Sequence, residues 1–412
     1  MLSDLALWRM YAAALASHAG VAGNDVFSVA GAATFSGLGN ADAQVGNWCT
    51  YQLGDGIPAA AGAYAPYSGL FAAYWLCLSY LVESAAGQPA LLQAAAGAGS
   101  LQADLARYRQ AVRAWQPGPP MPAGVNAAAN AVAPAALAPA PAQAHQTLLA
   151  ALGERVPALT AALNRCLLAS QQEASDLNMA ASLYAAGVEF RCPRYALDGW
   201  LAGLAAWRAA PAGGATAWSV SLPPPALAAL AGAAPAAALP AAGNWPSFLG
   251  LQGAGGAAVA GAINAAPLAA MVEGAPNGLP DGVNGLALSL GGFGVFALTP
   301  GSWFEASLLD GGQAALPAGA PDFFGAAGAL ALLPTGAVIG YQPRIALRAG
   351  SPQQAQALAA SLTRVGPFAV QGAAQDAPGA VACRGCNGTE VSFDGSGSDV
   401  PVLLGVISKP VS

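Results

Sequence analysis

The sequence predicts an α+β protein, with a helical N-terminal half and a mostly antiparallel β-region in the second half. Three observations predict this class. Apolar residues recur at helical spacing in the first half, short apolar runs bounded by turn residues dominate the second half, and these runs follow one another without regular intervening helices. The third observation disfavours a doubly wound sheet, in which strands and helices alternate.

The length of 412 residues allows two or three domains with a sizeable buried core. We expect a helical region at 1–186 and a β-rich domain at 187–412. Each contains a stretch of Pro and Ala whose composition cannot bury a core, at 117–145 and at 223–243. The first stretch is predicted to be a linker or loop.

Three of the predicted helices show one apolar stripe each. They cover residues 1–20, 90–116 and 146–186, and Pro157 is expected to bend the last one. The Pro-rich segment between the second and third would let them fold back as a long antiparallel helical hairpin. Nothing in the sequence fixes that pairing.

The most hydrophobic segment covers residues 67–82, between Pro66 and Glu83. It is shorter than the roughly 20 apolar residues that span a bilayer. A buried core helix is therefore the favoured interpretation, and a segment that inserts into a membrane is the alternative. The residues that would insert are Phe71, Tyr74, Trp75, Leu78 and Leu81.

Strands are predicted where apolar runs lie between turn residues. One lies at 26–29, within an otherwise loop-like stretch at 21–66. Two hairpins are predicted, with turns at Gly291-Gly292 and at Pro334-Thr335-Gly336. Further strands are predicted at 188–192, 217–222, 345–348, 367–370, 389–393 and 402–407, and short helices at 197–207, 303–309 and 353–362.

Three segments of the last third carry a resemblance. They are Thr-Pro-Gly-Ser-Trp-Phe at 299–304, Pro-Asp-Phe-Phe-Gly at 321–325 and Leu-Leu-Pro-Thr-Gly-Ala-Val-Ile-Gly-Tyr-Gln-Pro at 332–343. This pattern resembles an uncharacterised family of fungal and bacterial proteins with no assigned activity. The resemblance implies one folded C-terminal domain and leaves the function open.

Charge is scarce and unevenly distributed. Charged residues make up 8% of the chain, the net charge is −6, and no Lys or Arg lies between Arg9 and Arg107 or between Arg208 and Arg344. Nucleic-acid binding is excluded because it requires cations along the phosphate backbone. The expected partners are further copies of the chain or a lipid membrane, and no cofactor is expected.

The first ten residues do not look like a secretory signal, because Asp4 stands where positive charge is needed and Arg9 interrupts the apolar run. We therefore expect cytoplasmic synthesis, with release by a non-classical route left open.

The sharpest motif is Cys383-Arg-Gly-Cys386. Zinc would need two further ligands, which Cys166 and Cys192 supply only if the fold brings them close. A redox dithiol or local disulfide is the second interpretation, and unpaired structural thiols are the third and favoured one. The surrounding Gly and Asn suit a turn.

Other polar motifs give weaker predictions. The run from Asp394 to Asp399 resembles a calcium loop in composition but lacks the closing Glu, so a plain turn is favoured. The only histidines are His18 and His145, and neither neighbours a nucleophile motif. No catalytic residue is assigned.

A ligand pocket in the β-region is the last candidate site. Its residues would be an aromatic ring and three acids in a stretch without bases: Trp303, Glu305, Asp310 and Asp322. Exposed turn carboxylates are the favoured alternative for the three acids.

Low charge and a sheltered apolar helix favour a non-enzymatic protein that acts by apolar contact. It would insert into membranes, by analogy with helical pore-forming toxins, or self-associate. A structural or scaffold protein that forms assemblies, and an enzyme or small-ligand binder with an acidic and aromatic pocket, are the alternatives.

Overall fold

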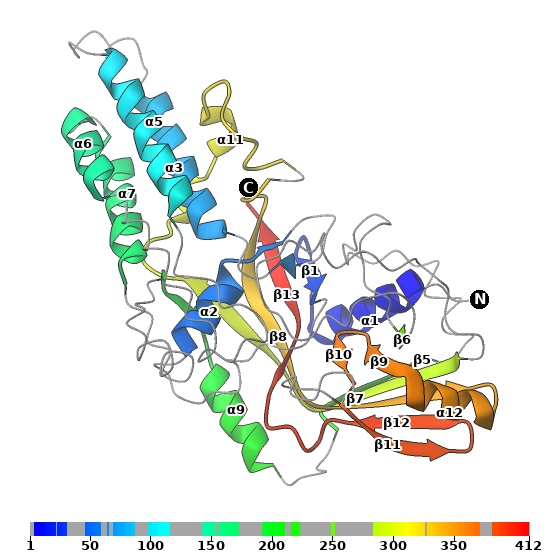
Figure 1. Ribbon diagram of the computed structural model, residues 1–412. Helices are drawn as coiled ribbons and strands as arrows, with labels where there is room; N and C mark the ends of the chain where they lie inside the picture. The colour runs from blue at the N-terminus through cyan, green and yellow to red at the C-terminus, as the bar shows by residue number, and fades with distance from the viewer. Residues whose placement is uncertain are drawn as a thin grey trace, which may run out of the picture.

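The computed structural model has the predicted α+β fold, with a cluster of helices at one end of an antiparallel sheet (Figure 1). The termini of the described chain lie near that sheet. The structure describes residues 4–21, 23–30, 46–58, 64–65, 69–86, 98–115, 142–152, 154, 156–172, 192–210, 216–222, 249–251, 283–325, 328–370 and 381–411. The stretch at 223–243 and almost all of the one at 117–145 lie outside these residues, as does most of the predicted strand at 188–192.

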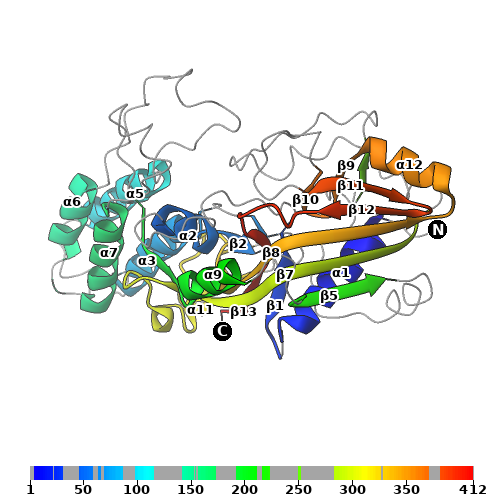
Figure 2. The same cartoon turned by 90° about the horizontal axis from the view of Figure 1, so that it is seen from below.

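Two long strands form the centre of the sheet. Strands β7 (Val283–Pro300) and β8 (Leu332–Ala349) pair antiparallel from Val283 opposite Ala349 to Ala297 opposite Gly336. Figure 2 shows them running lengthwise between the helical end and α12 (Pro352–Ser361). The shorter strands along their edges are β1 (Val26–Val29), β4 (Tyr195–Leu197), β5 (Trp218–Leu222), β11 (Ala382–Asn387), β12 (Glu390–Asp394) and β13 (Val402–Pro410).

Both predicted hairpins are wrong, because each predicted turn lies inside a continuous strand. Gly291 and Gly292 continue β7, and Gly292 pairs with Tyr341. Pro334 lies within β8, beyond the last residue of β8 that pairs with β7, Gly336. Pro334 has no N–H to donate, but no residue of β7 is paired with it, so no hydrogen bond to β7 is lost. A strand tolerates proline at such a position.

The sheet contributes to two apolar clusters on its opposite faces. Ala337 and Ile339 belong to the first cluster, which includes the helices at the end of the sheet, whereas Val338 belongs to the second, with α1 and α12. This alternation is the period of two expected for a strand buried on both faces.

The alternation changes at Gln342. Beyond it, the odd-numbered residues Ile345 and Leu347 belong to the second cluster, although the odd-numbered Ile339 belongs to the first. Gln342 has a φ of 51° and is the described non-glycine residue with a left-handed backbone. The change in the pattern thus coincides with a local distortion of the strand.

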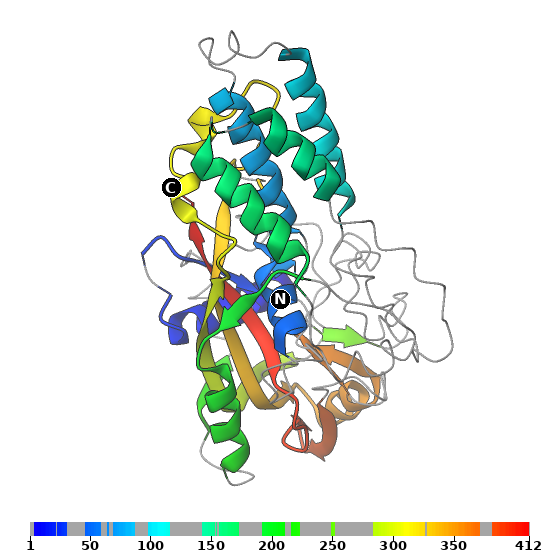
Figure 3. The ribbon, with the colours of Figure 1, turned by 90° about the vertical axis from the view of Figure 1, so that its left-hand side faces the viewer.

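Four helices form a bundle at one end of the molecule, opposite α9 and the β11–β12 hairpin (Figure 3). They are α3 (Leu70–Ala86), α5 (Ala98–Ala114), α6 (Ala142–Leu152) and α7 (Pro157–Ser170). Helix α5 contacts α6, which agrees with the expected hairpin, and α3 contacts α5 and α7. The predicted helix at 146–186 is interrupted, because Pro157 begins α7 instead of bending one long helix.

Several smaller elements complete the fold. The Ser351 side chain caps the start of α12 by accepting a hydrogen bond from the Gln354 N–H. One helix and two short strands lie in the stretch predicted as loop, α2 (Gly46–Gly54), β2 (Ile57–Pro58) and β3 (Tyr64–Ala65). The others are α1 (Asp4–His18), α9 (Trp200–Ala209), β6 (Leu249–Leu251), η3 (Ala306–Leu308), α11 (Gly312–Ala315), α12 (Pro352–Ser361), β9 (Leu362–Val365) and β10 (Phe368–Ala369).

Helix α9 lies against the glycine-rich part of β7. A Cβ at Gly292 would lie 2.6 Å from the indole of Trp207, so glycine permits this close approach. The Trp207 ring also stacks on Tyr341, with the ring planes 19° apart. The next residue, Arg208, donates to Asp399 at 2.8 Å and ties the helix to the loop between β12 and β13.

Asp55 fixes the start of α3 from the end of α2. Its buried carboxylate accepts hydrogen bonds from the Phe71 N–H at 2.7 Å, the Gly69 N–H at 3.1 Å and the Tyr51 hydroxyl at 2.9 Å. The first N–H groups of a helix have no partner within the helix, and this carboxylate satisfies them. Burial raises the pKa of Asp55 to about 7, although the three hydrogen bonds lower it.

We predict that Asp55 makes the stability of the protein depend on pH. The folded state binds the proton more tightly than the unfolded chain, so this contribution is full below about pH 4 and is lost as the pH rises through about 7. Asp55→Asn resembles the protonated side chain and removes the dependence. Urea unfolding should show the variant gaining up to about 4 kcal/mol over the wild type between pH 4 and pH 8; parallel pH profiles would contradict the assignment.

Candidate functional site

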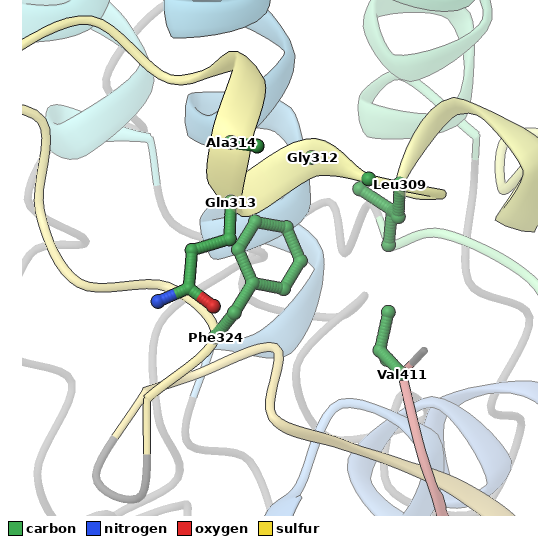
Figure 4. Close-up of a pocket in the computed structure, with 7 residues that line it drawn as sticks. Leu309, Gly312, Gln313, Ala314, Phe324 and Val411 are labelled. Atoms are coloured by element: carbon green, nitrogen blue, oxygen red, sulfur yellow. The ribbon is translucent and has the colours of Figure 1, made fainter.

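A pocket opens where the helical bundle meets the end of the sheet. It has a volume of about 410 Å³ and lies between α11, the segment that follows it and the residue after β13 (Figure 4). Its lining is mostly apolar, with one amide side chain. The lining residues are Leu309, Gly311, Gly312, Gln313, Ala314, Phe324 and Val411.

A hydrogen-bonded turn and a long-range backbone hydrogen bond hold the pocket walls in place. The Gly312 N–H donates to the Leu309 carbonyl at 2.8 Å, and the Val411 N–H donates to the Ala331 carbonyl at 3.1 Å. The Phe324 ring lies against Gly312, where a Cβ would be 3.0 Å from its edge. Figure 4 shows the Phe324 ring and the Gln313 side chain on one side of the hollow, with Leu309 and Val411 on the other.

Trp303 anchors this region and does not line the pocket. It is 2% exposed, its indole N–H donates to the Arg194 carbonyl at 3.0 Å, and its ring lies 4.9 Å from that of Phe71. The other rings around it belong to Tyr74 and Tyr195. Trp303 therefore joins the segment before the pocket to α3.

The three predicted acids lie on the exposed surface, and none of their side chains lines the pocket. Glu305 forms an ion pair with Arg165 of α7, and Asp322 accepts from the Gly325 N–H at 2.7 Å. Asp310 lies in the chain between two lining residues, Leu309 and Gly311. The pocket therefore lies in the part of the chain that the sequence singled out, but its lining does not include the four predicted side chains.

The five residues expected to insert into a membrane lie in the core of the bundle. Phe71, Tyr74, Trp75 and Leu78 have no exposed surface, and Leu81 is 6% exposed. In the described chain, no helix combines the length and the apolar character needed to span a bilayer.

The bundle contains a buried chain of polar groups that connects all four of its helices. The Trp75 indole N–H donates to the Tyr108 hydroxyl at 2.5 Å, and that hydroxyl lies 3.2 Å from Nδ1 of His145. Nε2 of His145 lies 2.7 Å from Oδ1 of Asn164. Each group can donate to the next, from Trp75 to Asn164, if His145 is neutral with its proton on Nε2.

The position of His145 stabilises its neutral form. Burial lowers the pKa of His145, while the bond to Asn164 raises it. The neighbouring titratable groups, Tyr108 of α5 and Cys166 of α7, are buried and neutral, since burial raises the pKa of each. A protonated ring could only donate from Nδ1 to the Tyr108 oxygen, which already accepts from Trp75, and the Tyr108 O–H would lose the acceptor that the neutral ring provides. The sequence showed a histidine, and only the packing of four helices reveals its partners.

The Cys383 and Cys386 thiols are free and exposed on β11, so the predicted turn is corrected to a strand. Cys166 and Cys192 are buried in the first cluster. Within the described ranges, no three His, Cys, Asp or Glu side chains gather as a metal site. The segment from Asp394 to Asp399 leads from β12 towards β13, and both carboxylates pair with arginines. Burial raises the pKa of each, but hydrogen bonds, from Ser396 to Asp394 and from Arg208 and Tyr341 to Asp399, together with the arginine charges, lower it overall.

Comparisons with known families, with curated proteins and with solved structures return no significant match. The resemblance of the C-terminal third therefore stays a prediction.

We predict that His145→Ala destabilises the protein by about 2–4 kcal/mol at pH 7.5, because it leaves a cavity and two buried polar groups without their partner. His18→Ala is the matched control, since His18 is exposed and is the other histidine of the chain. The contribution of His145 is full above about pH 6.5 and is lost as the pH falls through its lowered pKa. Urea unfolding from pH 7.5 to pH 5 measures both effects; equal losses in the two variants would contradict the role of the buried chain.

Proposed function

We propose that the protein is a non-enzymatic binder of a small apolar ligand, held in the pocket beside α11. The observation that supports this proposal is the apolar lining of a hollow of about 410 Å³. Ligand pockets of this size are typically apolar, with a few polar groups that fix the orientation of the ligand. Gln313 is the side chain that can supply such a group.

The chemistry around the pocket favours binding over catalysis. The acids nearest in the chain are exposed or paired, and the lining, as far as the described residues form it, offers no nucleophile or titratable side chain. General acid–base catalysis needs a titratable group within hydrogen-bond reach of the substrate. We therefore propose a ligand that is recognised by shape and apolar contact, such as an aliphatic chain or an aromatic ring.

Ala314→Trp is expected to fill the pocket and to weaken the binding of an apolar ligand at least tenfold. Ala315→Trp is the matched control, because it adds the same side chain to the next position of α11, which does not line the pocket. The measurement is a titration with the neutral fluorescent probe N-phenyl-1-naphthylamine. Saturable binding that is lost in the first variant alone supports the proposal; no saturable binding, or the same loss in both variants, contradicts it.

Membrane insertion remains a second proposal, and the buried polar chain is the observation that favours it. The helix that carries the five expected insertion residues, α3, is joined to α5, α6 and α7 through His145. Protonation of His145 would break this chain and weaken the contacts that keep α3 in the core. Insertion would then be promoted by acid.

This second proposal predicts that the protein releases a trapped dye from phosphatidylcholine vesicles at pH 5 and not at pH 7.5. His145→Phe should abolish the acid response because it removes the titrating group, and His18→Ala should keep it. The absence of leakage across pH 5 to 8 would reject insertion and leave the pocket proposal untouched.

A further inference from the structure

Two exposed thiols lie on one edge of the sheet, far in the chain from the pocket. Strand β11 contains Cys383 and Cys386, and both side chains are exposed. In a regular strand, residues three apart point to opposite faces, and their Cα atoms are about 10 Å apart. A disulfide requires Cα atoms within about 6.8 Å, so a regular strand would keep these thiols separate.

A β-bulge removes this obstacle. Cys383 pairs with Phe393 and Cys386 pairs with Val391, so three steps along β11 match two steps along β12. The two cysteines therefore share one face, with Cα atoms about 6.6 Å apart by strand geometry. Gly385 allows the bulge, because its φ of 138° is a conformation that side chains rarely adopt.

The surroundings distinguish the two sulfur atoms. The Cys386 thiol lies 3.5 Å from the Ala355 carbonyl of α12 and donates to it. Burial and the neighbouring Cys383 raise the pKa of Cys386. Arg384, which lies between the two cysteines in the sequence, pairs instead with Asp394 at 2.9 Å. Cys383 is thus the more available nucleophile, and Cys386 is positioned to react second.

We propose that Cys383 and Cys386 form a reversible dithiol–disulfide site that exchanges with low-molecular-weight disulfides. The Cys383 thiolate attacks the S–S bond of a small disulfide RSSR, forms a mixed disulfide and releases RS⁻. The Cys386 thiolate then attacks the Cys383 sulfur and releases the second RS⁻. Two cysteine thiols are oxidised, RSSR is reduced to two RSH, and the two protons pass from the cysteines to the released thiolates.

Cys383 and Cys386 differ from the other four cysteines because they are exposed to solvent and small molecules can reach them. Cys49, Cys77, Cys166 and Cys192 are buried, so a small oxidant reaches them poorly in the folded protein. Exposed disulfides at the limit of the favourable geometry are easily reduced and suit a regulatory role. Closure of the site would fix the bulged edge strand beside α12.

The test equilibrates the folded protein with reduced and oxidised glutathione and counts reactive thiols by maleimide labelling and intact mass. The wild type should lose two thiols together, without retained glutathione, whereas Cys383→Ser and Cys386→Ser should each keep one glutathione. Phenylarsine oxide, which needs two adjacent thiols, should protect the wild type from labelling and neither single variant.

Gly385→Ala tests the role of the bulge, and we expect its equilibrium constant for disulfide closure to fall at least tenfold. Gly397→Ala is the matched control, since a Cβ there meets open space, and it should behave as the wild type. Glutathione retained on both cysteines of the wild type, or two thiols that resist oxidation, would overturn the proposal. The glutathione titration of the wild type is sufficient by itself to test the proposal, so the test does not depend on whether Gly385→Ala folds.

Discussion

The continuous pairing of β7 with β8 is the constraint on which the rest of the structure depends. Both strands are long enough to reach from the helical bundle to α12, so one two-stranded ribbon contributes to both apolar clusters. The shorter strands and the surrounding helices attach to this ribbon at different levels along it. The left-handed Gln342 marks the level at which the burial pattern of β8 changes.

The composition suggested apolar contacts at the surface, but in the described part of the chain the large apolar side chains lie mostly in the interior. In the described part of the chain, the exposed large apolar side chains are Leu168, Leu201 and Val295, and they lie on three different elements. The apolar content instead fills two cores, where aromatic side chains such as Trp8 and Trp75 are fully buried. Inside the bundle, the buried side chains of Trp75, Tyr108 and His145 form hydrogen bonds with one another and with Asn164, which makes this part of the interior specific as well as apolar.

The longer helices were predictable because their apolar stripes report burial directly, as the buried face of α3 confirms, and the start of α12 was predictable from its cap at Ser351. The short helix α2, in a stretch rich in Gly, Asn and Asp, was missed. The hairpins were not, because Gly291-Gly292 and Pro334 look like turns whenever the partner strand is unknown. Glycine at Gly292 serves the contact with Trp207, which lies far away in the sequence. The lining of the pocket could not be predicted for the same reason, because Leu309, Phe324 and Val411 converge only through tertiary packing and no local sequence pattern indicates an apolar pocket.

The sheet joins the two ends of the described chain. Strand β1 lies among the first thirty residues, and its partner β13 lies among the last twelve, with Val26 opposite Ser408. A ribosome adds β13 only after it has made all of the residues between Val29 and Val402. Edge strand β1 must therefore wait, unpaired, while this long stretch is synthesised, and its pairing with β13 is a highly non-local step that slows folding.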